Sequence, residues 1–241
     1  RLLFVKENAV FTDIEDKFLT TLKEEKQFLD NKPESALYNY EIANLYKEQG
    51  HRYEPKIKDE ERWKIKEALE LCNQTITAYP KSRGAKKCQV LKEQILYPEL
   101  SILTENYIPV QESGRVLINY KNVDHLYFKV FSIDQSAIKR LEKIYKTHEK
   151  VALIKELKEV NSWDTKLPDE QDYQMHDTEI VLPVLAQGSY LILATKDKDF
   201  DKGSFFSYGY VQSTNLSLVE SRTNSQQIFQ VLDRKNGKPV P

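Results

Sequence analysis

The sequence has few of the residues from which metal, cofactor and thiol-based sites are built. It contains two cysteines, one methionine and seven glycines in 241 residues. Its four histidines (His51, His125, His148 and His176) stand apart from one another, and neither a His-Glu-x-x-His motif nor a cysteine cluster occurs. The ligand spacing that a metal site requires is missing, so we expect neither a metal nor a cofactor.

Long apolar runs and an excess of one charge are missing as well. No run approaches the roughly 20 apolar residues that span a bilayer. The 36 basic and 37 acidic residues leave a formal net charge of -1, which gives no field that would attract nucleic acid or a membrane surface. The composition is 40% apolar, and the length suits one large domain or two ordinary ones, each with its own core.

Residues 1–98 have the pattern of a helical region, with apolar residues at helical spacing in four segments. Thr12 and Glu15 match a capping box before the first segment, Gly50 is a C-terminal stop for the second, and Ser82 can cap the fourth. Helix pairs joined by short turns resemble degenerate tetratricopeptide units. The helices are expected at about residues 14–29, 34–49, 62–79 and 83–96.

From residue 99 the spacing changes to that of β-strands. The clearest stretch runs from Gly114 to Asp134 and reads GRVLINYKNVDHLYFKVFSID, with apolar residues alternating on both sides of a polar turn. This pattern predicts two consecutive strands of one half-buried sheet. Several short strands at such spacing predict an antiparallel β-sandwich. A first strand is expected from residues 100–103 and 107–110, and further strands are expected at residues 178–185, 189–195, 205–211 and 215–220.

The predicted sandwich occupies residues 99–223 and is interrupted by a segment with helical spacing. Residues 135–160 predict one or two amphipathic helices laid on the sheet, and residues 161–175 predict a polar loop. Together with the helical region, this organisation gives an α+β fold.

Residues 224–241 are expected to be a linker and the first strand of a following, truncated domain. A strand is predicted at residues 228–232, and Asn236-Gly237 predicts a type I′ turn whose return strand is missing. The chain also begins at Arg1 without a methionine or a signal-peptide pattern. We therefore expect a piece of a longer polypeptide.

Two groups of side chains are candidate sites. Cys72 and Cys88 lie almost symmetrically about a predicted turn, so they either form a disulfide or pack as small buried residues on facing helices. Phe206, Tyr208 and Tyr210 share one face of a predicted strand. They form either an exposed platform for a sugar or a peptide, or ordinary aromatic pairs inside the sandwich.

One pattern is typical of a serine enzyme, because Ser136 and Lys139 have the Ser-x-x-Lys spacing of penicillin-recognising enzymes. The nearest Tyr-x-Asn sequence, at Tyr120 and Asn122, precedes the serine, which is the wrong order. We expect Ser136 to cap the inserted helix and expect the chain not to be an enzyme.

Three stretches of the sequence resemble one protein family. They are RWKIKEALELCNQTITAYPKSRGAKKC, then SGRVLINYKNVDHLYFKVFSID followed by LPVLAQGSYLILATKD, and finally STNLSLVESRTNSQQIFQVLDRKNGKPVP. They resemble, in order, the helical segment near the N-terminus, the first macroglobulin domain and the exit from that domain in the large alpha-2-macroglobulin-like proteins of Bacteroidetes-type bacteria.

The resemblance implies a many-domain protein that is exported to the periplasm or the outer membrane, often on a lipid anchor. Such a protein captures attacking proteinases after they cleave a bait segment. Its thioester needs Cys and Gln three residues apart, whereas here Leu91 stands three residues after Cys88 and Gln94 stands six residues after it. No thioester is carried over, and no bait segment is recognisable.

The sequence therefore predicts a non-catalytic scaffold fragment of a proteinase-trapping inhibitor. Its expected partners are other domains of the same longer chain, and target proteinases through the full-length protein. Contact with a membrane is expected only through a lipid anchor outside these residues. The alternative is a cell-surface module that binds a glycan or a peptide.

Overall fold

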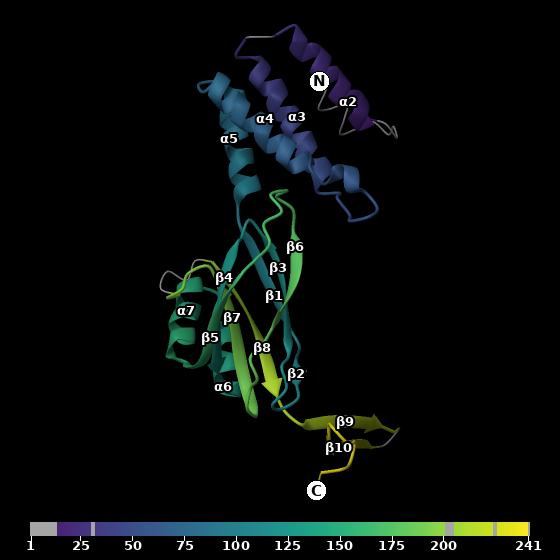
Figure 1. Cartoon of the computed structure of the whole chain (residues 1–241), viewed down its shortest axis with the longest axis vertical. Coiled ribbons are helices and arrows are strands. Elements are labelled where there is room, and N and C mark those ends of the chain that lie inside the picture. The colour runs from purple at the N-terminus through teal and green to yellow at the C-terminus, as the bar shows by residue number, and fades with distance from the viewer. Residues whose placement is uncertain (1–13, 30–31, 201–204, 224–225, 241) are drawn as a thin grey trace. The chain divides into compact units, whose positions relative to one another are not determined.

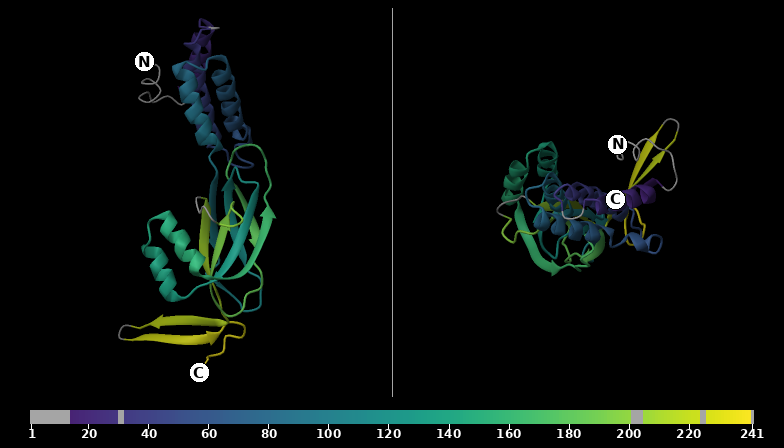
Figure 2. Two further views of the ribbon diagram at one scale, coloured as in Figure 1. Left: turned by 90° about the vertical axis from the view of Figure 1, so that its left-hand side faces the viewer. Right: turned by 90° about the horizontal axis from the view of Figure 1, so that it is seen from above.

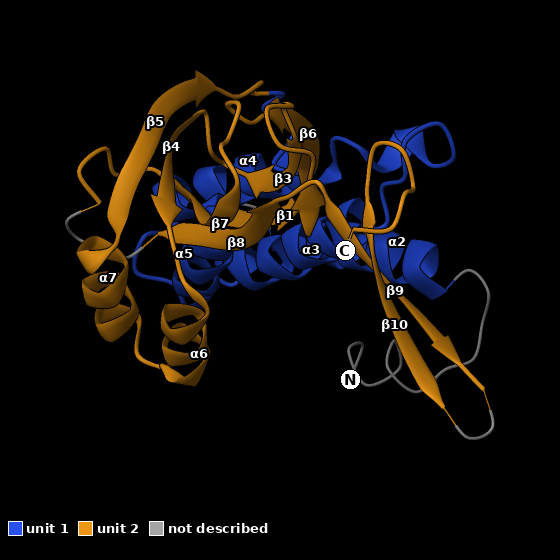
Figure 3. Ribbon diagram, turned by 90° about the horizontal axis from the view of Figure 1, so that it is seen from below, with its two compact units in different colours: residues 1–98, 170–174 blue, residues 99–169, 175–241 orange. Residues whose placement is uncertain are grey.

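The structure, a computed structural model, describes residues 14–29, 32–200, 205–223 and 226–240. The fold is α+β, and the chain divides into two compact units (Figure 3). The helical unit comprises residues 1–98 and 170–174, and the β unit comprises residues 99–169 and 175–241. Among the described residues, no helix is long and apolar enough to cross a bilayer.

The helical unit is built around three helices that pack on one another, with a fourth packed on the first of them (Figure 1). Its core is a cluster of small and medium apolar side chains contributed mainly by the last two helices. Burial of this stripe explains the helical spacing of the sequence. The helices are α2 (Ile14–Gln27), α3 (Ser35–Gly50), α4 (Lys64–Ala78) and α5 (Arg83–Leu96), with a short 3-10 turn at Asp59–Glu61 before α4.

One of the helix ends predicted from the sequence is confirmed by the structure, and another differs. The Ser82 hydroxyl caps α5 by accepting a hydrogen bond from the Ala85 amide at 3.0 Å, as expected. Gly50 is not a left-handed stop: it is the last helical residue, and a side chain there would collide with Ile65. The glycine therefore permits the close approach of α4. The capping box at Thr12 lies outside the described residues, and the tetratricopeptide-like character of this region stays a prediction.

Residues 170–174 belong to the helical unit, although the sequence places them in a polar loop of the sandwich. The buried Asp172 carboxylate accepts a hydrogen bond from Arg62 Nε at 3.0 Å. The Gln174 side-chain amide donates to the carbonyl oxygens of Gly50 at 3.0 Å and of Arg62 at 3.1 Å. Sequence reasoning failed here because these partners are more than 100 positions apart in the chain.

The β unit contains two facing sheets. One has the order β1-β3-β6 and is antiparallel, and the other has the order β2-β8-β7-β4-β5 and is antiparallel except for the short parallel pair β2–β8 (Figure 1). The strands are β1 (Glu99–Thr104), β2 (Tyr107–Ile108), β3 (Arg115–Lys121), β4 (His125–Ser132), β5 (Lys158–Lys166), β6 (His176–Val181), β7 (Gly188–Thr195) and β8 (Phe206–Ser213).

The residues predicted to face inward on β3 and β4 are buried in one core between the sheets. However, β3 and β4 lie in different sheets, so the prediction that they share one sheet was wrong. A turn that includes Asn122, with φ of 54°, takes the chain from one layer to the other. Because strands in facing layers present alternate residues to a common core, the period-2 pattern is the same whether two strands are paired or opposed.

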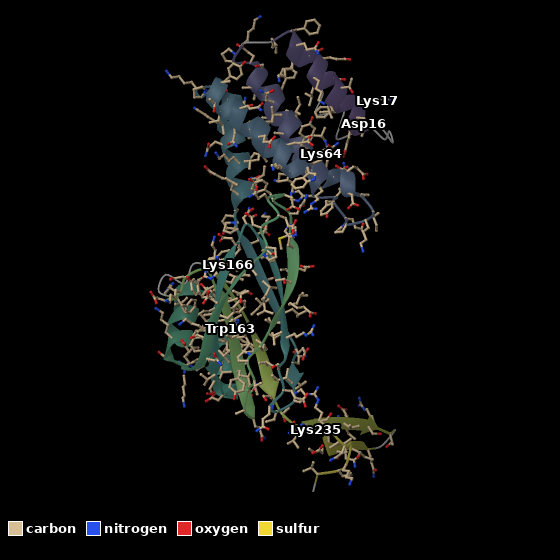
Figure 4. All side chains as sticks on the ribbon, viewed as in Figure 1. Asp16, Lys17, Lys64, Trp163, Lys166 and Lys235 are labelled. Atoms are coloured by element: carbon tan, nitrogen blue, oxygen red, sulfur yellow. The ribbon has the colours of Figure 1, made fainter. Side chains whose placement is uncertain are left out.

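The segment predicted to be helical forms two helices, α6 (Gln135–Lys143) and α7 (Thr147–Glu156). The residues after α7 were wrongly expected to continue the helix to residue 160 and then to form a loop. These residues form β5, which pairs with the edge of β4. Trp163 (labelled in Figure 4) stacks on Phe128 with ring centroids 5.0 Å apart, while most of β5 is exposed. An exposed edge strand needs no apolar alternation, so the sequence carries little signal for it.

Helices α6 and α7 cover the outer face of the five-stranded sheet, where they enclose a second core (Figure 2). That core joins Leu141 and Ile154 of the helices to Leu191 and Leu193 of β7. The sheet is therefore buried on both faces at β7, which explains the continuous apolar run of this strand.

The last two strands form a separate two-stranded sheet rather than part of the sandwich. Strand β9 (Leu216–Arg222), which was expected in the sandwich, pairs antiparallel with β10 (Gln227–Asp233). The turn that follows is also not type I′, because Gly237 has a positive φ of 70° and Asn236 does not. The chain does turn back there, since Leu232 and Pro239 form a bridge.

Candidate functional site

The aromatic stripe on β8 lies against the covering helices and not in the open. Phe206, Tyr208 and Tyr210 are half-buried and pack on the core beneath α6 and α7. Consecutive rings contact each other, with centroids 6.2 Å and 5.8 Å apart. An open sugar platform needs exposed ring faces, which these half-buried rings do not offer. The rings also lie outside the core between the two sheets, so they are not the pairs inside the sandwich that the packing alternative describes.

The hydroxyl of Tyr210 shows how closely this stripe is covered. It is buried, and the described residues offer it no hydrogen-bond partner. Burial raises the pKa of Tyr210, and the neighbouring Tyr208 raises this pKa further. The Lys150 ammonium lies 5.8 Å from the Tyr208 ring centroid. The stripe is thus a contact between sheet and helix.

Cys72 and Cys88 are free thiols in the structure and are buried together in the core of the helical unit. A hydrogen bond between the two thiols raises the pKa of Cys72 and lowers that of Cys88. The positions on facing helices agree with the small-buried-residue alternative, and neither sulfur is exposed to a partner.

The histidines make local pairs and do not converge. His125 Nε2 lies 2.8 Å from a carboxylate oxygen of Asp164 on the adjacent strand, and its ring contacts that of Tyr127. His148 lies on the exposed first turn of α7, and His176 contacts the Tyr120 ring. Within the described residues, no group of three or more potential metal ligands occurs.

Ser136 is not the cap of the inserted helix, which is a correction to the sequence prediction. Asp134 is the cap, because its carboxylate accepts the Ala137 amide hydrogen bond at 2.8 Å. The Ser136 hydroxyl donates to the same carboxylate at 2.8 Å. These bonds, chiefly the one from Ala137, lower the pKa of Asp134. Ser136 therefore supports a helix end on the surface.

The most distinctive surface is the two-stranded sheet of β9 and β10, here called the terminal hairpin. Cross-strand neighbours point to the same side, so the register assigns its residues to two faces. Leu218, Phe229 and Val231 lie on one face, and Val219 and Ile228 lie on the other. Leu218 is 65% exposed and Phe229 is 57% exposed. Both faces therefore carry exposed apolar side chains.

The terminal hairpin is tied to the end of the sandwich through Asn215. The Asn215 side-chain oxygen accepts a hydrogen bond from the Val110 amide at 3.0 Å, and its carbonyl accepts one from the Arg234 amide at 2.7 Å. Tyr107 and Leu216 line a cavity of about 400 Å³ at this junction, together with other residues of the hairpin. Sequence reasoning found the strands but not this surface, because it assigned β9 to the sandwich.

Comparison with known proteins yields weak structural similarity only. No protein-family model matches the sequence, and no curated protein matches it. A crystal structure of native alpha-2-macroglobulin from Escherichia coli spanning domains MG0-NIE-MG1 is similar at 11% identity and a TM-score of 0.42, with 59% of this chain and 47% of that chain covered. The chain thus spans less than half of that structure.

Two further structures are similar at comparable or lower levels. One is native alpha-2-macroglobulin from Escherichia coli spanning domains NIE-MG1, at 12% identity and a TM-score of 0.40, with 60% of this chain and 74% of that chain covered. The other is the CARDB domain of the PF1109 protein from Pyrococcus furiosus, at 10% identity and a TM-score of 0.28, with 49% and 88% covered. Similarity this weak does not establish a shared function.

Proposed function

We propose that the chain is a non-catalytic part of the scaffold of a bacterial, cell-envelope, alpha-2-macroglobulin-like protein that traps proteinases. Two features support the proposal. The three sequence stretches resemble consecutive segments of that family. A helical unit is followed by a sandwich whose five-stranded sheet carries inserted helices, which is the order that the resemblance implies.

The observation that carries the proposal is the terminal hairpin. An isolated two-stranded hairpin is marginally stable in water, and this one exposes apolar side chains on both faces. Strand β9 also has one neighbour only among the described residues, so its outer edge is open. Both features fit strands that belong to a further β-sandwich. A scaffold made of successive macroglobulin-like domains supplies one.

The partners then follow from the scaffold role. The terminal hairpin packs against other domains of the same longer chain, and target proteinases are met by the full-length protein. The bait segment and any thioester of that protein lie outside residues 1–241. We also propose that the full-length protein is exported to the periplasm or the outer membrane. It would contact the membrane through a lipid anchor outside residues 1–241.

The proposal assigns no catalytic group to this chain. The side chains singled out from the sequence have local structural roles: Asp134 caps a helix, Ser136 supports that cap, and Cys72 and Cys88 pack in a core. None of them is arranged with a nucleophile, a base and an orienting group.

The function is tested on the longer polypeptide that contains this chain. It is incubated with a broad-specificity proteinase, and the proteinase is then assayed on a large protein substrate and on a small peptide substrate. We expect discrete cleavage of the polypeptide and loss of activity on the large substrate alone. A proteinase inactivated beforehand is the control and should not be captured. Unchanged activity on both substrates after cleavage would exclude trapping and favour a binding module.

A further inference from the structure

A groove between α3 and α5 of the helical unit combines cations with an apolar floor. Its cavity has a volume of about 330 Å³. The helix pair is held tightly, because Gly84 of α5 leaves no room for a side chain against the backbone of α3. The main lining side chains are Tyr40, Arg83, Lys86, Lys87, Val90 and Leu91.

The charged side chains that α5 contributes to this groove are all basic. Residues 80–92 contain five basic residues and no acidic residue. The first turn of α5 therefore carries cations where the helix dipole favours acidic side chains. In the described part of the chain, Arg83 and Lys86 form no ion pair. This arrangement does not serve the stability of the helix, which points to an anionic ligand.

The groups that face these cations leave a net positive groove. Glu41 of α3 lies 3.8 Å from the Lys87 ammonium, which also lies 4.3 Å from the Tyr40 ring centroid. At the far end, Lys47 donates a hydrogen bond to the Gln94 side chain at 3.1 Å. Burial raises the pKa of Tyr40, and two acids of α3, Glu41 and Glu48, lie near this side chain and raise its pKa further. These two acids are outnumbered by four cations: Arg83, Lys86, Lys87 and Lys47.

The exposed apolar side chains in the groove favour one class of anionic ligand over another. Val90 is 54% exposed within the groove, next to Leu91 and the Tyr40 ring. A polyphosphate would match the cations but leave Val90 in water, whereas a peptide can present an apolar side chain between carboxylates. We propose that this groove binds an acidic peptide segment of a protein partner, with an apolar side chain over Val90 and carboxylates on Arg83 and Lys86. The proposal is independent of proteinase trapping.

The test uses the full chain and a fluorescein-labelled heptapeptide with a central leucine flanked by three glutamates on each side. Fluorescence anisotropy at low salt should show saturable binding that weakens as salt is raised. Replacing both cations (Arg83→Glu with Lys86→Glu) should weaken binding at least tenfold. The matched control (Lys139→Glu with Lys143→Glu) makes the same change of net charge on the exposed surface of α6 and should leave binding unchanged. Circular dichroism checks that both variants fold.

Two further probes separate a peptide site from a general anion surface. A heptapeptide with glycine in place of the leucine should bind at least fivefold more weakly, and inorganic polyphosphate of equal charge should compete poorly. Equal binding of the glycine peptide, or equal weakening by the control variant, would overturn the proposal. So would an absence of binding by the leucine peptide at millimolar concentration.

Discussion

Replacing Asp172 tests the finding that residues 170–174 are part of the helical unit. The Asp172 carboxylate is 1% exposed, accepts a hydrogen bond from Arg62 Nε, and also accepts one from the Gln174 amide at 3.1 Å. Asp172→Ala removes both bonds and leaves the Arg62 guanidinium paired with Glu170, whose carboxylate is exposed to water. We therefore expect the helical unit, and not only a surface loop, to lose stability.

The magnitude follows from the burial of the two partners. A hydrogen bond to a charged group contributes about 1.5–3 kcal/mol, and breaking a fully buried ion pair costs about 3–5 kcal/mol. The Arg62 side chain is 29% exposed, so water replaces part of the lost interaction. This places the expected loss in the free energy of unfolding at about 2 kcal/mol.

The two tryptophans provide separate reporters for the measurement. Trp63 stands next to Arg62, 5.0 Å from its guanidinium carbon, and Trp163 lies in the β unit against Phe128. In a Trp163→Phe background, urea unfolding followed by Trp63 fluorescence reports the helical unit alone. With a denaturant slope of about 1 kcal/mol per M, the midpoint should fall by about 2 M.

The control removes the other carboxylate that pairs with Arg62. Glu170 is 47% exposed in its ion pair at 2.8 Å, so Glu170→Ala should change the free energy of unfolding by less than about 0.5 kcal/mol. A change equally small for Asp172→Ala would refute the reasoning, because the loop would then contribute nothing to the helical unit.

Three other predictions concern individual side chains. Gly84→Ala forces a side chain into the backbone of α3 and should lower the free energy of unfolding by about 2 kcal/mol, measured with Trp63; an unchanged midpoint would contradict the close packing. Asp134 has a lowered pKa in the folded state, so its contribution is present at neutral pH and is lost as pH falls below about 4. Asp134→Ala should therefore destabilise the protein at pH 7 more than at pH 3, and equal effects in thermal melts at both pH values would argue against the cap. Cys72 and Cys88 should both react with iodoacetamide after the reduced protein is unfolded, and neither should react in the native state, as mass spectrometry would show.

Much of the fold could be predicted because local spacing reflects burial. The apolar stripes of α4 and α5 and the inward residues of β3 and β4 lie where their periods place them. The apolar periodicity could not show which strands pair with each other. Two strands have the same pattern whether or not they belong to one sheet. An exposed edge strand such as β5 has no apolar alternation to detect, because its pairing with β4 stabilises it.

The candidate sites show the same limit. Phe206, Tyr208 and Tyr210 were correctly placed on one face of a strand, but only the fold shows that α6 and α7 cover that face. The Asp134 cap was missed because Ser and Asp are both favourable cap residues and stand two positions apart. The role of Asp172 depends on a contact with Arg62 that no local pattern encodes.

The most direct test of the scaffold account is hydrogen exchange at the terminal hairpin. Amide exchange is followed by mass spectrometry in two proteins: this chain by itself and the longer polypeptide of which the proposal makes it a part. Peptides from β3 and β4 serve as internal references, because their core is complete within the sandwich. In the chain by itself, few packed side chains protect β9 and β10, so their amides should exchange quickly.

In the longer polypeptide the account predicts at least tenfold slower exchange across residues 216–222 and 227–233, with the reference peptides unchanged. This result would mean that a further domain covers the apolar faces of the hairpin. Equal exchange of the hairpin in both proteins would mean that nothing covers those faces, and it would contradict the claim that this chain is one part of a continuous scaffold.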